Sequence, residues 1–99
     1  MQVDKGRLLQ ETLARLSKLR EGEGLLLQPY KKDRAVCVIR RENMYRVVER
    51  GFARKEFVVE TKKIRKLLKT LCKKEFPRSN KIWLNVIAPE EADKFTFPG

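Results

Sequence analysis

The sequence predicts one α+β domain, an antiparallel sheet of four to five strands with two helices packed on one face, in the order α-β-β-β-β-α-β. Three observations lead to this fold class. Two segments, ending near residues 19 and 76, carry apolar residues at helical spacing. Short runs rich in valine, isoleucine and tyrosine fill residues 25–60. A last run, at residues 81–87, alternates apolar and polar side chains.

The length of 99 residues, 41% of them hydrophobic, suits a single domain with a modest core. We expect this domain to span residues 1–87. Residues 88–99 contain two prolines and three acids, so we expect an acidic C-terminal tail. The tail either docks through Phe95 and Phe97 or stays mobile.

The first helix is expected to begin after Asp4, a residue type that caps helices, and to end before Gly22 and Gly24. Its leucines follow the three-and-four spacing of one buried stripe. Burial in the core is the favoured interpretation, and a coiled coil between two chains is the alternative. The stripe consists of Leu9, Leu13 and Leu16, flanked by Leu8 and Leu19.

Four strands are expected between the helices. Pro29 near the end of the first strand suggests an edge position, since proline cannot donate a ladder hydrogen bond. Asn43 lies in the turn of a central hairpin, where it tolerates the left-handed conformation that tight turns require. The expected strands are residues 25–30, 35–39, 45–48 and 56–60.

The second helix is expected to begin with Thr61 as its cap and to run to about Phe76, where Pro77 stops it. One arc of this helix is apolar: Ile64, Leu67, Leu68, Leu71 and Cys72. The opposite arc carries Lys62, Lys66, Lys69 and Lys73, flanked by Lys63, Arg65 and Lys74. A solvated helix face usually mixes glutamate with lysine, but residues 62–74 contain no acid.

The net charge of +11 is concentrated in the middle of the chain. Residues 31–87 carry a net charge of +12, whereas residues 1–30 carry +1 and residues 88–99 carry −2. A surface this positive attracts polyanions and raises their local concentration.

The composition offers no equipped catalytic centre, metal site or cofactor site. Histidine is absent, Ser17 and Ser79 therefore have no histidine partner, and the five glycines form no phosphate loop. Cys37 and Cys72 lie in apolar patterns, so we expect both to pack in the core as small hydrophobic residues. Two cysteines are too few for a disulfide framework, so we expect a reducing, cytoplasmic compartment. No apolar run is long enough to span a membrane.

The sequence therefore predicts a small basic nucleic-acid-binding module, for RNA or DNA, that contacts mainly the phosphate backbone with little sequence specificity. Tyr30, Tyr45 and Trp83 are the candidates for base stacking, with packing in the core as the default for each, and Trp83 is the favoured candidate of the three. The alternative is an interaction or regulatory module that docks on an acidic protein, alone or as a homodimer. The expected binding residues are Arg40, Arg41, Arg46, Arg50, Arg54, Lys55, Lys62, Lys63, Lys66, Lys69, Lys73 and Trp83.

In layout alone, this order of elements resembles the double-stranded-RNA-binding domain and the strands-then-helix unit of single-strand-binding coactivators. The run Thr61-Lys62-Lys63 is similar to the lysine-rich start of the final helix in the first family. The glycines that precede that helix in the family, and the small alanines within it, are missing from this chain.

Overall fold

The computed structural model describes residues 1–96 and has an α+β architecture. A 3₁₀ turn precedes each of the two longer helices: η1 (Lys5–Arg7) before α1 and η2 (Thr61–Lys63) before α2. In chain order the other elements are β1 (Gln2–Asp4), α1 (Leu8–Leu16), β2 (Gly24–Pro29), β3 (Ala35–Arg41), β4 (Met44–Arg50), β5 (Arg54–Glu60), α2 (Ile64–Glu75), β6 (Lys81–Ile87) and α3 (Pro89–Asp93).

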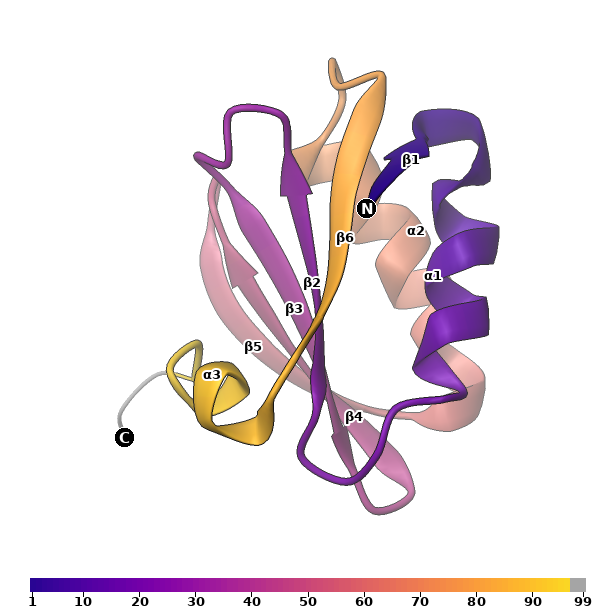
Figure 1. Cartoon of the computed structure of the whole chain (residues 1–99), viewed down its shortest axis with the longest axis vertical. Coiled ribbons are helices and arrows are strands. Elements are labelled where there is room, and N and C mark those ends of the chain that lie inside the picture. Colours follow the sequence, from indigo (N-terminus) through magenta and orange to yellow (C-terminus); the bar gives the residue numbers. More distant parts are fainter. Residues whose placement is uncertain (97–99) are drawn as a thin grey trace.

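The strands form one antiparallel sheet of six, in the order β1-β6-β2-β3-β4-β5. Strands β2 to β5 follow one another as a meander, but β6 returns to lie between β1 and β2 (Figure 1). Val3 of β1 pairs with Ile82 of β6, and Leu27 of β2 pairs with Leu84. Strands β1 and β5 are therefore the two edges of the sheet.

Helices α1 and α2 cover the same face of the sheet (Figure 1). The leucine stripe of α1 and the apolar arc of α2 both pack into this layer, which confirms their expected core role. The Tyr45 hydroxyl donates a hydrogen bond of 3.3 Å to the Leu16 carbonyl oxygen and links β4 to the end of α1. The sheet contributes buried residues that include Leu25, Leu27, Val36, Val38, Val47, Ile82 and Leu84.

The opposite face of the sheet is covered in part by α3, which lies across the sheet from α1 (Figure 1). Ala92 of α3 packs against Cys37, Ile39 and Val48 in a second, smaller apolar cluster, and Phe95 joins its margin. The expected C-terminal tail thus docks, with Phe95 as one of its aromatic contacts. Phe97 lies outside the described residues.

The sheet has more strands than the sequence predicts, and both missed elements are short. Strand β1 has three residues and helix α3 has five, too few for a period to stand out. The expected caps also differ from the structure. The side chain of Asp4 makes no capping hydrogen bond, and the Thr61 hydroxyl donates instead to the carbonyl oxygen of Asn43, at 3.0 Å.

Two predictions from the sequence are wrong, one about a sheet edge at Pro29 and one about the turn at Asn43. Strand β2 is central, and Pro29 is accommodated because it is the last residue of β2, beyond Leu27, where pairing with β3 ends. In the β3–β4 turn the left-handed residue is Glu42, with φ of 52°, and not Asn43. The backbone N–H of Glu42 donates to Glu21 Oε1 at 2.6 Å, a contact that sequence alone does not reveal.

Replacing Leu68, which is fully buried between α2 and the sheet, tests the packing of this helix. We expect Leu68→Ala to lower the free energy of unfolding by about 2–5 kcal/mol, because it removes apolar contacts and leaves a cavity. Lys69→Ala, one residue along the helix and exposed, is the control and should change stability by less than about 0.5 kcal/mol. Urea denaturation followed by circular dichroism measures both. Equal effects would contradict the orientation of α2.

Candidate functional site

The solvent side of α2 and its leading turn carries six exposed cations. Ile64, Leu68 and Leu71 turn into the core, so the polar arc of the helix faces water. Lys66 and Lys73 lie two turns apart, about 10 Å along the axis. We call this surface the α2 cationic face; its members, all exposed, are Lys62, Lys63, Arg65, Lys66, Lys69 and Lys73.

Most side chains of the α2 cationic face have no acidic partner. Lys62 lies 3.7 Å from Glu60, and the other five cations make no ion pair within residues 1–96. The only acid in α2, Glu75, is buried on the other side of the helix. The repulsion between neighbouring cations is therefore not offset on the surface.

Helix α1 provides a contrast within the same layer. Its Glu11 binds Arg7 at 3.1 Å and also binds Arg15, so one carboxylate serves two cations. The hydrogen bond from Arg15 is the main cause of the lowered pKa of Glu11, and the nearby charges of Arg15 and Arg7 add to it. The surface of α1 thus shows the usual neutralisation of charge, which α2 lacks.

The start of α2 adds to the local positive potential. The N-terminal turn of α2 contains no acidic residue, and no side chain caps it. The N-terminal end of a helix carries a partial positive charge from its aligned peptide dipoles. Lys62, Lys63 and Arg65 cluster around that end, so an anion bound there is attracted by both the side chains and the backbone.

Two of the remaining expected residues lie on the helix-covered side. Lys55 is exposed on β5 and pairs across the sheet with Glu49, whose carboxylate contacts Lys74 of α2 at 3.1 Å. Lys55 therefore lies near the C-terminal end of α2. Arg40 is half-buried, and its guanidinium donates a 2.7 Å hydrogen bond to the carbonyl oxygen of Leu19. This contact gives Arg40 a structural role between β3 and the segment that follows α1.

The other five expected residues lie on the opposite face of the sheet, because neighbours in a strand alternate between faces. Two of these arginines hold the C-terminal segment in place. Arg41 binds Asp93 at 2.9 Å, and Arg50 donates to the carbonyl oxygen of Lys94 at 2.9 Å. The guanidinium of Arg50 also lies 5.1 Å from the centre of the Phe95 ring. The five residues are Arg41, Arg46, Arg50, Arg54 and Trp83.

The structure thus divides the twelve expected residues between two faces and does not gather them on one surface. Trp83 is half-buried, and Lys32 lies over its ring at 5.1 Å from the centroid. A base stacked on Trp83 would be across the sheet from the α2 cationic face. Sequence reasoning also left Arg65 out of the set, although its place on the polar arc of α2 would have included it.

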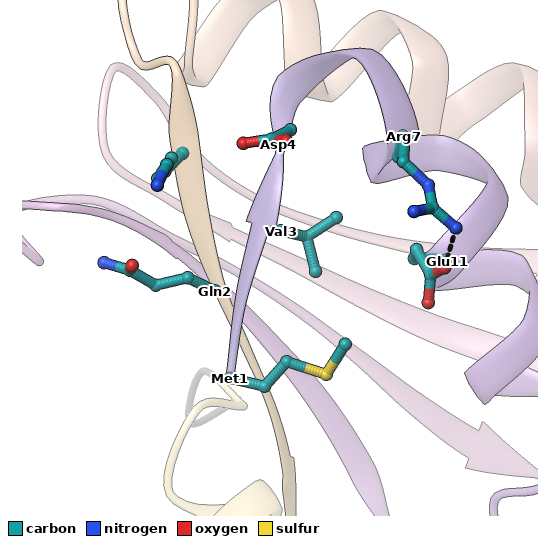
Figure 2. Close-up of a pocket in the computed structure, with 7 residues that line it drawn as sticks. Met1, Gln2, Val3, Asp4, Arg7 and Glu11 are labelled. Carbon is teal, nitrogen blue, oxygen red and sulfur yellow. Dashed lines mark hydrogen bonds and ion pairs between the residues drawn. The ribbon is translucent and has the colours of Figure 1, made fainter.

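A hollow of about 300 Å³ lies between β1 and α1. Figure 2 shows Val3 on β1 and Met1 just before this strand pointing toward the helix, with the Arg7–Glu11 ion pair on the far wall. Asp4 and Lys81 also line this hollow, so its positive and negative charges balance. Such a lining does not select an anion or a cation.

A pair of glutamates that the sequence did not single out is buried where β4 meets the end of α2. Glu49 is 0% exposed and Glu75 is 2% exposed, and their carboxyl groups share a hydrogen bond. Glu75 Oε1 accepts the backbone N–H of Phe52 at 2.9 Å, and Arg34 lies 3.9 Å from the same oxygen. A Cβ at Gly51 would clash with Glu75 Oε1, so the β4–β5 turn needs glycine at this point.

Burial raises the pKa of Glu49, and the hydrogen bond with Glu75 raises it further, against the smaller effect of Lys74. Burial also acts to raise the pKa of Glu75. Hydrogen bonds from Glu49 and from the backbone of Phe52 and Ala53 outweigh that effect, so the pKa of Glu75 is lowered overall. Of the two carboxyl groups, Glu49 therefore keeps its proton to the higher pH, and the pair ties the β4–β5 turn to α2.

Neither cysteine is ionised near neutral pH, because burial raises the pKa of Cys37 and of Cys72 to about 12. No group of three or more acidic or cysteine side chains within residues 1–96 is placed to hold a metal ion. None of the helices in the described part of the chain combines the length and hydropathy that a membrane span requires.

The buried glutamate pair predicts a defined pH dependence of stability. Because the pKa of Glu49 is raised in the folded state, its contribution to the free energy of unfolding is complete at low pH. This contribution is lost as pH rises through the folded-state pKa of Glu49. The lowered pKa of Glu75 means that its contribution is lost as pH falls through its own folded-state pKa. Glu49→Gln keeps this position neutral at every pH. We expect the variant to lack the loss of stability with rising pH that is attributable to Glu49, as measured by urea unfolding across a pH series.

Glu90→Gln, at an exposed position on α3, is the control for removing one carboxylate. It should leave the pH profile of the wild type almost unchanged. If Glu49→Gln and the wild type gave parallel stability curves across the pH series, the assignment of a raised pKa to Glu49 would be wrong.

Comparisons with known proteins returned no match. No protein-family model matches the chain, and no curated protein or solved structure was found to match it. The resemblance in layout to nucleic-acid-binding folds is therefore not supported by a family match.

Proposed function

We propose that this protein is a cytoplasmic nucleic-acid-binding module that grips the phosphate backbone of RNA or DNA through the α2 cationic face. The observation that carries the proposal is that five of the six exposed cations on this face have no acidic partner within residues 1–96. A helix surface that serves solubility alone usually interleaves both signs of charge.

The physical basis of binding is the release of counterions. Each lysine or arginine that neutralises a phosphate frees a condensed cation from the nucleic acid, and this favours binding whatever the base sequence. A bound phosphate chain also relieves the repulsion among Lys62, Lys66 and Lys69, which succeed one another along one side of the helix. We therefore expect tight binding at low salt and little preference among sequences.

Phe52 offers nucleic-acid bases an aromatic ring for stacking close to the α2 cationic face. Phe52 in the β4–β5 turn is 73% exposed, and Lys74 Nζ lies 5.6 Å from the centre of its ring. A ring beside cations suits a single-stranded ligand, whose bases are free to stack. Phe52 thus replaces Trp83 in our proposal as the favoured stacking residue, because Trp83 lies across the sheet.

Salt dependence gives the first test. Fluorescence anisotropy titrations of labelled single-stranded RNA and DNA at several salt concentrations should give a log–log slope of roughly −3 to −4, the value for four to six neutralised phosphates. An affinity that does not change with salt concentration would exclude binding through phosphate contacts. No binding to either polymer at low salt would overturn the proposal and leave an acidic protein as the candidate partner of the α2 cationic face.

Charge reversal gives the second test. The double variant Lys66→Glu/Lys69→Glu should weaken binding roughly a hundredfold at low salt, because each lost phosphate contact costs about tenfold. Both side chains are exposed, so circular dichroism and the thermal midpoint should stay close to those of the wild type.

The matched control is Lys31→Glu/Lys81→Glu. These lysines are exposed on the β2–β3 loop and at the start of β6, away from α2, and the control changes the net charge by the same amount. We expect a much smaller loss of affinity. Equal losses in both double variants would mean that net charge alone, and not the α2 cationic face, determines binding.

A further inference from the structure

Strand β5 is a long, open edge of the sheet. All seven of its residues pair with β4 on one side, and no segment within residues 1–96 pairs with its other side. The opposite edge, β1, has only three residues. A seven-residue edge leaves a row of backbone N–H and C=O groups that can pair with another strand. Proteins commonly protect such edges with charged side chains.

The charges of β5 follow an order that suits self-pairing. Arg54 and Lys55 stand at its beginning, Glu60 stands at its end, and Phe57 is its central residue. In an antiparallel pair of identical strands the beginning of one strand lies against the end of the other. The positive end of each strand therefore meets the negative end of its partner.

We propose that β5 pairs antiparallel with β5 of a second copy of this chain, in the register that places the two Phe57 residues opposite each other. Arg54 of each copy then stands opposite Glu60 of the other, so the dimer contains two opposite-charge pairs. Val58, which is 59% exposed, approaches its own counterpart diagonally across the two-fold axis. This inference is independent of nucleic-acid binding.

The charge order selects this register among those that keep the sheet faces aligned. A shift of two residues in one direction pairs Glu56 with itself, and a shift of two in the other direction pairs Glu56 with Glu60. Like charges directly opposite each other destabilise a strand pair. Arg54 and Glu56 each have an interaction within their own chain, and the selection of the register rests only on the order of charges along β5.

The proposed register places the helix layers of both copies on the same side of a continuous sheet, with six strands from each copy. Both α2 cationic faces then lie on that side. Each chain carries a net charge of +11, so long-range repulsion opposes association. We expect a weak dimer that strengthens as salt screens this repulsion.

Sedimentation equilibrium of the protein alone, over a wide range of concentration and at moderate salt, tests the proposal. We expect a reversible monomer–dimer equilibrium. Arg54→Glu sets two carboxylates opposite each other at both ends of the interface, and Glu60→Arg does the same with two cations. Each single variant should weaken dimerisation roughly tenfold to a hundredfold, and the double variant Arg54→Glu/Glu60→Arg should restore it.

The control is Arg78→Glu, at an exposed position in the loop between α2 and β6. It lowers the net charge as Arg54→Glu does, which reduces repulsion, so it should leave dimerisation unchanged or slightly stronger. Far-UV circular dichroism and the thermal midpoint confirm that each variant folds. A monomer at all concentrations, or a dimer that neither single variant weakens, would overturn the proposal. Because no nucleic acid is present, failure here is distinct from failure of the proposed binding function.

Discussion

The packing of α2 on the sheet is the constraint from which the charged surface follows. Ile64, Leu68 and Leu71 lie on one arc and are buried, so the helix has one stable orientation and its cations must face water. Burying such a side chain contributes about 1.5–3 kcal/mol. Repulsion between like charges one turn apart costs about 0.2–0.5 kcal/mol per pair. The core therefore holds the α2 cationic face together without help from acidic neighbours.

The two faces of the sheet differ in what their cations bind, more than in how many cations they carry. Arg41 and Arg50 hold the C-terminal segment through an ion pair with Asp93 and a hydrogen bond to Lys94. Their charges are used within the fold. Five of the six cations of the α2 cationic face make no ion pair within residues 1–96, and this difference makes α2 the stronger candidate for contact with a polyanion.

Helical and strand periods explain what could be predicted from the sequence. Spacing alone indicated the buried and exposed arcs of α2 and the four strands β2 to β5, with a hairpin between β3 and β4. It did not indicate β1, because Gln2 pairs with Trp83 far along the chain. The expected convergence of the cations was not found, because Arg46 and Arg50 alternate with inward-facing residues of β4. The burial of Glu49 depends on the end of α2 packing over it, a tertiary contact with no local pattern.

The insertion of β6 between β1 and β2 has a consequence for how the molecule is made. The ribosome delivers β1 before the other five strands of this sheet, yet β1 has no hydrogen-bonded neighbour in the sheet until residues 81–83 arrive. The meander from β2 to β5 can form during translation, but one side of β2 stays unpaired until β6 has been synthesised. Pairing of β6 with β1 and β2 joins segments far apart along the chain, and such long-range pairing is slow in folding.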